Sequence, residues 1–196
     1  SEALERQAGI LQARAAAWAN IIEKNIAGGE SDTVIPEDEL DSSAMSAAFW
    51  FKSSGETAWS YGAPDQSGSP RTFAEFASGL KPEHRFLLRT VEDGNQIAGA
   101  LLTTEGAAIA AVAPIHASSG DKASLLLVFR LIDASLRSQM YQQAGIDFQI
   151  WPVNDPALAP EERGVVQELL AGRDVQVAEA GADEFRVYSS YAGLSG

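Results

Sequence analysis

Cysteine is absent from this chain of 196 residues, and histidine occurs only at His84 and His116. Without a thiol, the protein forms no disulfide, no thiolate metal site and no cysteine nucleophile. No pair with His-x-x-x-His spacing is present, so a zinc site would need three scattered ligands. A chain that lacks cysteine is also chemically safe in an oxidising space such as the periplasm.

The sequence also lacks the local motifs of common catalytic sites. It contains no Gly-x-Ser-x-Gly elbow and neither of the glycine-rich phosphate loops. His116 follows Pro114-Ile115 at the predicted end of a strand, which favours a surface or rim position over a catalytic base. We therefore predict no catalytic residue, no metal site and no cofactor, and we expect the chain not to be an enzyme.

Basic residues and long apolar runs are scarce as well. The chain has 14 Lys and Arg against 27 Asp and Glu, a formal net charge of -13. This charge repels phosphate backbones, so nucleic acid is excluded as a partner. No apolar run approaches the roughly 20 residues that span a bilayer. The acidic stretch 30–41 could hold a divalent cation, but it lacks the order of a calcium loop and favours a solvated connector.

What the chain does have is a central run of three apolar segments separated by turn residues. Ile97 to Thr103 and Ala107 to Ile115 flank Thr104-Glu105-Gly106, and Ala123 to Leu131 follows a polar turn. Such segments predict a three-stranded antiparallel meander. Because the second and third segments are continuously apolar, we expect both of their faces to be covered.

Further elements are predicted on both sides of this meander. Capping and turn residues set the limits of the helices, and apolar or aromatic runs mark the strands. The expected elements are a hairpin of 44–52 and 57–62, a short helix of 72–79, a strand from Phe86 to Val91, a helix from Asp133 to Ala144, a strand from Asp147 to Val153, a helix of 160–171, and a hairpin of 175–178 and 184–191.

A long helix is predicted at the start of the chain, over residues 2–25, ended by Gly28-Gly29. Its apolar residues alternate at spacings of four and three, which is the pattern of a heptad seam. They are Leu4, Ala8, Leu11, Ala15, Trp18 and Ile22. Two interpretations stay open: a parallel homodimer seam in a signalling stalk, or a stripe packed on the chain's own sheet. The pattern starts without a capping segment, and we expect the chain to be part of a longer protein.

Aromatic and arginine residues are the candidates for binding a small ligand. Trp50, Trp59 and Tyr61 belong to the first predicted hairpin, where aromatic side chains are core residues unless a pocket stays unfilled. Arg89 and Arg130 are placed near strand ends, where a guanidinium can bind a carboxylate at two points. Surface ion pairing with the abundant acids is the alternative. Arg89 is the preferred anion anchor, and His116 completes this candidate set.

The order of these elements resembles a known family. The early hairpin with Phe49-Trp50-Phe51 and Gly55, the segment from Gly99 to Gly106, the Ala113-Pro114-Ile115 step and the run from Leu125 to Asp133 are similar to CHASE4 domains. The strand of 185–189 also suits this family. CHASE4 domains are extracytoplasmic sensor modules related to Cache and PAS-like folds, found in histidine kinases and in diguanylate cyclases or phosphodiesterases.

The resemblance implies an α+β fold in which the long helix packs on a central antiparallel PAS/Cache-like sheet with flanking helices. Residues 1–27 would form the signalling and dimer helix, and residues 28–196 the sensor domain, as one structural unit. The chain would be the periplasmic part of an inner-membrane receptor, a homodimer that senses a small molecule or a protein and meets the membrane only through flanking transmembrane helices. A free-standing acidic binding or scaffold protein is the alternative.

Overall fold

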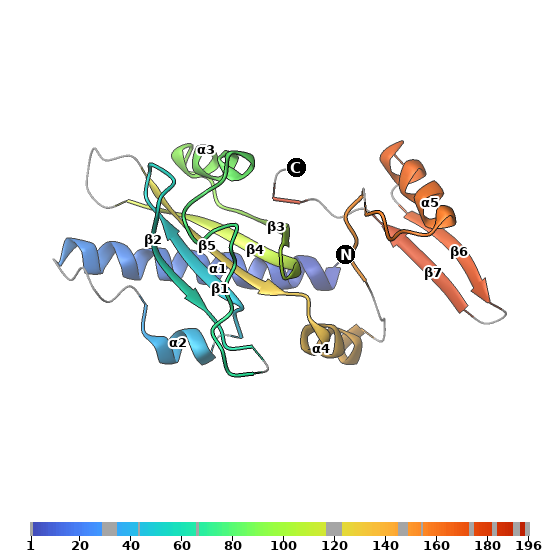
Figure 1. Ribbon diagram of the computed structural model, residues 1–196, viewed down its shortest axis with the longest axis horizontal. Coiled ribbons are helices and arrows are strands. Elements are labelled where there is room, and N and C mark those ends of the chain that lie inside the picture. The colour runs from blue at the N-terminus through green and yellow to red at the C-terminus, as the bar shows by residue number, and fades with distance from the viewer. Residues whose placement is uncertain are drawn as a thin grey trace.

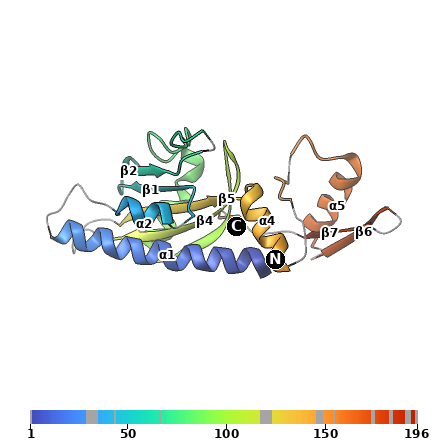
Figure 2. The same cartoon turned by 90° about the horizontal axis from the view of Figure 1, so that it is seen from below.

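The computed structural model describes residues 2–28, 35–42, 44–65, 67–116, 123–144, 149–153, 155–172, 175–181, 184–189 and 193–194. In this part of the chain a long helix lies along one face of an antiparallel sheet, and shorter helices flank the sheet (Figures 1 and 2). The predicted α+β class with a long N-terminal helix on a central antiparallel sheet is confirmed.

The main sheet has five strands in the order β2-β1-β5-β4-β3, and every pairing is antiparallel. The predicted hairpin and meander are both present in it. The hairpin is β1 (Ala47–Phe51) with β2 (Thr57–Gly62), and the meander is β3 (Ile97–Thr103), β4 (Gly106–Ile115) and β5 (Ser124–Leu131). The register of β1 with β5, Phe49 opposite Leu127, joins the hairpin to the meander.

Three helices cover one face of this sheet. They are α1 (Glu2–Ala27), α2 (Glu37–Ser42) and α4 (Ala134–Ala144), and they share one buried cluster with alternate residues of β1, β4 and β5. Asp133 caps α4 as predicted, because its carboxylate Oδ1 accepts a hydrogen bond from the Leu136 N–H at 2.9 Å. Along β4 this face presents Ala111 and Ala113, whose small side chains let α1 approach the sheet closely.

The predicted seam of α1 faces this sheet. Ala8, Leu11, Ala15, Trp18 and Ile22 are buried in the cluster, and Leu4 packs against it. The interpretation as a stripe on the chain's own sheet therefore holds. Five of these six residues are thus buried within one chain, and their interpretation as a homodimer seam stays a prediction.

Phenylalanine dominates the opposite face of the sheet. Phe49, Phe51 and Phe129 from β1 and β5 meet Phe73 and Phe76, which lie in a stretch without regular helix. The Phe73 and Phe129 rings meet edge to face, with their centroids 4.7 Å apart. These side chains are almost fully buried and fill the space between the sheet and the segment above it.

We call residues 71–80 the cover segment, and backbone contacts hold both of its ends to the first hairpin. The Arg71 N–H donates to the Ala63 carbonyl at 3.1 Å, and the Leu80 N–H donates to the Gly55 carbonyl at 2.8 Å. Gly79 has a φ of 132°, and a Cβ there would lie 2.6 Å from the Gly55 carbonyl oxygen. A side chain at position 79 would therefore push the cover segment off the hairpin.

Three predicted elements need correction. Residues 86–91 are helical, not a strand, in α3 (Phe86–Glu92), which follows the 3₁₀ turn η1 (Pro82–His84). The short helix predicted at 72–79 is a series of turns. Residues 149–153 are described and contain no strand, while 147 and 148 lie outside the described residues.

The C-terminal elements stand apart from the main sheet (Figure 1). The predicted last helix is α5 (Pro160–Leu170), and the predicted last hairpin is β6 (Val175–Gly181) with β7 (Glu184–Ser189), a separate two-stranded sheet. No residue of α5 is buried. The chain then returns to the main sheet, where the Leu194 N–H donates to the Ala100 carbonyl on β3 at 2.9 Å.

The phenylalanine cluster predicts a large stability loss on truncation. Phe129→Ala should lower the free energy of unfolding by about 3–5 kcal/mol, because it leaves a cavity among three other rings. Phe129→Leu should cost less. Urea denaturation measures both, with the exposed Leu102→Ala as the control, for which a change within about 0.5 kcal/mol is expected. A loss in Phe129→Ala no larger than in the control would contradict the packing described.

Candidate functional site

The contact between α1 and the rest of the domain is the first candidate for a functional surface. Besides its apolar stripe, α1 makes polar contacts at three levels. The Trp18 indole N–H donates to Glu39 Oε1 on α2 at 2.6 Å, and the His116 backbone N–H at the end of β4 donates to Glu23 Oε1 at 2.6 Å. Gln12 Nε2 donates to the Gln96 carbonyl before β3. A shift of α1 along its axis would break directional bonds to several elements at once.

The predicted aromatic residues of the hairpin lie on this same α1 face. Trp50 and Trp59 are direct partners in the β1–β2 register, and Tyr61 lies opposite Ala48. All three are half-buried and pack against the α1 cluster. Among the described residues, none accepts a hydrogen bond from the buried indole nitrogen of Trp50. The three side chains complete the outer part of the core beside α1 and α2.

The predicted polar residues do not join the aromatic ones in a single site. Arg130 lies on the α1 face, but four positions along β5 from Leu126, the partner of Trp50. Its guanidinium donates a hydrogen bond to Gln139 Oε1 at 3.1 Å. Burial lowers the pKa of Arg130, and the nearby carboxylate of Asp133 partly offsets this shift. His116 directly follows Ile115, the last residue of β4.

Arg89, the preferred anion anchor, lies on the opposite side of the sheet. It is an exposed residue of α3, not a strand residue. The prediction placed it at a strand end because the run from Phe86 to Val91 was interpreted as a strand. The structure therefore separates Arg89 from Trp50, Trp59 and Tyr61 by the thickness of the sheet.

A buried carboxylate fastens the cover segment to the meander. Glu75 is only 6% exposed, and it accepts hydrogen bonds from the Thr104 N–H at 2.8 Å and from the Thr104 hydroxyl at 2.7 Å. Burial alone would raise the pKa of Glu75, but the hydrogen bonds from Thr104 outweigh it, so that the pKa lies below its ordinary value. The carboxylate form thus holds the cover segment to the β3–β4 turn.

His84 lies beside the cover segment, next to Phe76. Its ring centroid lies 5.1 Å from that of Phe76, and its Nδ1 is buried with no hydrogen-bond partner among the described residues. Burial lowers the pKa of His84, while the nearby Glu83 and Glu75 oppose this and Lys81 adds to it. Burial against Phe76 of the cover segment therefore favours the neutral imidazole of His84 over the charged one.

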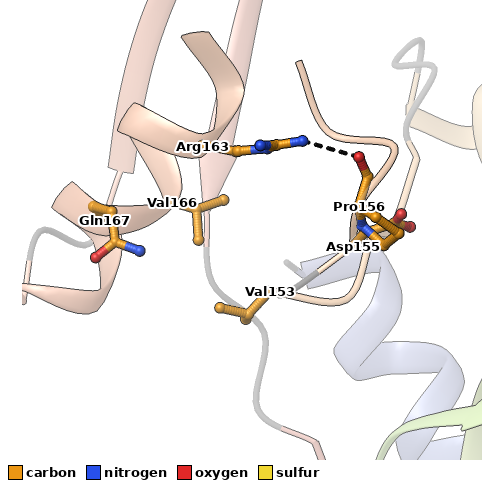
Figure 3. Close-up of a pocket in the computed structure, with 6 residues that line it drawn as sticks. All are labelled: Val153, Asp155, Pro156, Arg163, Val166 and Gln167. Carbon is orange, nitrogen blue, oxygen red and sulfur yellow. Dashed lines mark hydrogen bonds between the residues drawn. The ribbon is translucent and has the colours of Figure 1, made fainter. Parts of the chain in front are cut away.

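Two open hollows lie near the C-terminal end of the described core. The first, of about 340 Å³, lies between α5 and the preceding loop (Figure 3). Arg163 reaches across it, and its guanidinium donates to the carbonyls of Pro156 and Leu158 at 2.9 and 3.0 Å. These bonds give Arg163 a structural role in holding the loop to α5.

The second hollow, of about 280 Å³, lies beside α4 and includes Arg137 and Trp151. None of the six residues predicted to bind a ligand lines either hollow. Trp151 belongs to no motif of the sequence, and only its position beside α4 in the folded chain gives it neighbours that a ligand could use.

In the part of the chain that the structure describes, no group of three His, Asp or Glu residues could hold a metal ion. No helix in the same residues is long and apolar enough to pass through a bilayer.

The CHASE4 domain family model matches residues 5–151, which is most of the chain, and the protein belongs to the CHASE4 family. CHASE4 domains are extracellular, non-catalytic sensing domains of signalling proteins. No curated protein matches the chain.

The family match covers the main sheet and its helices but not the C-terminal elements. The matched residues include α1 to α4 and the whole five-stranded sheet. The strand at 185–189, which the sequence comparison counted as suiting the family, is β7 and lies outside the match, as do α5 and β6. The predicted division of the chain at residue 27 stays a prediction.

The environment of His84 predicts a pH dependence of stability. Because its pKa in the folded protein lies below the ordinary 6.5, the unfolded chain binds this proton more readily. The stabilising contribution of the neutral ring is complete above the unfolded pKa and is lost as the pH falls through 6.5 towards the folded pKa. His84→Phe keeps the ring contact and removes the titration, so its urea midpoint should fall less than that of the wild type between about pH 8 and about pH 5.5. Equal falls in the two proteins would show that His84 does not contribute.

Proposed function

We propose that this chain is the periplasmic input domain of a receptor in the inner membrane, whose output is a histidine kinase or a diguanylate cyclase or phosphodiesterase. A small molecule or a protein is the signal, and the domain itself carries no catalytic step. One observation supports this most: the chain belongs to a sensory family, and its first element, α1, runs along the whole sheet. A change in the sheet would therefore act directly on α1.

The mechanical properties of α1 support a role as the relay. Its 26 residues extend about 39 Å at 1.5 Å per residue. Its buried stripe and its bonds to α2, to the end of β4 and to the residue before β3 couple its position to that of the sheet. In this proposal, binding favours one of two positions of the sheet against α1, and the helix passes this displacement towards the membrane.

The relay predicts that bonds to α1 set the level of output. Trp18→Phe removes the 2.6 Å bond to Glu39 and keeps an aromatic side chain in the core. In the full receptor, this variant should change the activity of the output domain by about twofold or more at equal membrane abundance, because a bond to a charged group is worth about 1.5–3 kcal/mol. Arg85→Gln, at an exposed position just before α3, is the control and should keep the wild-type output. A Trp18→Phe receptor with wild-type output would refute the relay.

A homodimer remains part of this proposal, but through a different face of α1. The outward face carries Gly9, Ile10, Ala13 and Ala17, which are exposed, and Ile10 is 49% exposed. These residues follow a helical spacing, and their small side chains would let two helices approach closely.

The absence of cysteine gives a clean test of this dimer face. Ala13→Cys on the outward face should form a disulfide-linked dimer of the full receptor in membranes, observed on a non-reducing gel. Leu11→Cys, at a buried position, should not. Cross-linking at position 11 and not at 13 would restore the original seam, and no cross-link at either position would reject a dimer through α1.

A further inference from the structure

The hollow beside α4 combines an aromatic side chain with a guanidinium, and we call it the α4 groove. Its floor is the end of the meander, where the Ile132 N–H donates to the Ala107 carbonyl at 2.8 Å. One wall is α4, and the other is the segment that follows it in the chain. The residues that line it are Ala107, Ile132, Arg137, Gln149, Ile150 and Trp151.

Four of the six residues that line the α4 groove are apolar, and one of them has a large aromatic side chain. Trp151 is 40% exposed, whereas Trp18 of α1 is 1% exposed. Ile132 and Ile150 are half-buried beside it. An indole left open to solvent at the side of a hollow gives a flat surface on which an apolar or aromatic group can pack.

The charge of the α4 groove is opposite to that of the protein. The chain carries a net charge of -13, yet Arg137 is the one ionisable residue among the six that line this hollow. A guanidinium has five N–H donors, so Arg137 can bind a carboxylate while it keeps contacts within its own chain. Gln149 adds an amide that can donate to the same oxygens or accept from a neighbouring polar group.

The size of the hollow limits the ligand. A volume of about 280 Å³ is just below the range of about 300–1,000 Å³ that is usual for small-molecule sites, so only a small ligand would fit. We propose that the α4 groove binds a small aromatic monocarboxylate, with its ring against Trp151 and its carboxylate on Arg137. This deepens the proposed sensory function, because it names a class of signal and a place for it.

The position of the α4 groove gives the ligand a means to act. Trp151 is the last residue of the CHASE4 match, and the chain continues from it towards α5. Leu136 and Met140 of α4 are buried in the cluster that also holds the α1 stripe. A ligand held between Arg137 and Trp151 would thus join α4, and through it the α1 face, to the segment that leads to the C-terminal elements.

Binding can be tested on the chain as it is, with phenylacetate as the probe. The four indole N–H resonances report on the four tryptophans, and Trp151→Phe identifies the one from the groove. Phenylacetate should shift the Trp151 resonance with a dissociation constant of about 0.1–5 mM. Phenylacetamide has the same shape without the charge and should bind at least about tenfold more weakly.

Two arginine variants distinguish the groove from general anion binding. Arg137→Gln should weaken phenylacetate binding at least about tenfold, while Arg85→Gln, at an exposed position just before α3, should bind like the wild type. Far-ultraviolet circular dichroism shows that each variant is folded. Equal binding of the acid and its amide, equal binding by Arg137→Gln and wild type, or no shift of the Trp151 resonance would each overturn the proposal.

Failure here is distinguishable from failure of the proposed function. If the full receptor responds to Trp18→Phe but Trp151 does not respond to phenylacetate, the relay stands and the groove does not. If phenylacetate binds through Arg137 but receptor output responds neither to it nor to Trp18→Phe, the groove is a site and the relay is wrong.

Discussion

The pairing of β4 with β5 is the constraint on which the other layers depend. Both strands lie inside the sheet, and their apolar side chains are buried on both faces of it. On the α1 side, alanines of β4 leave room for the stripe of a long helix. On the other side, Phe129 of β5 packs against Phe73 and Phe76 of the cover segment. A sheet covered on both faces transmits a displacement from one layer to the other, because close-packed interiors do not absorb it.

Secondary structure was predictable where the apolar residues follow one clear period, and not where their spacing fits both a helix and a strand. The strands of the meander are bounded by turn residues and match the structure closely. Phe86 to Val91 failed because a short apolar run fits a strand or a helix equally well. Its buried residues, Leu87, Leu88 and Val91, follow the spacing of a helix that packs on the sheet. The turns at 72–79 are held by tertiary bonds, above all Glu75 with Thr104, which no local pattern contains.

The candidate binding residues show a different limit. The sequence indicates which side chains have suitable chemistry, but the sheet decides which of them meet. Trp50 and Trp59 were placed together correctly because their strands pair, whereas the helical position of α3 moved Arg89 to the opposite side. Arg137 and Trp151 are separated in sequence by residues that carry no recognisable motif. Only the return of the chain beside α4 brings them to one hollow.

The bridge between Leu194 and Ala100 has a consequence for how the molecule avoids self-association. β3 is an edge strand, and an edge offers unpaired peptide groups to any other extended chain. Gly193 pairs with the middle of this edge, and the buried side chain of Leu194 holds it there. The exposed Leu102 lies two residues further along the same strand. Residues 193 and 194 thus interrupt the β3 edge and shorten the run of peptide groups that another extended chain could pair with.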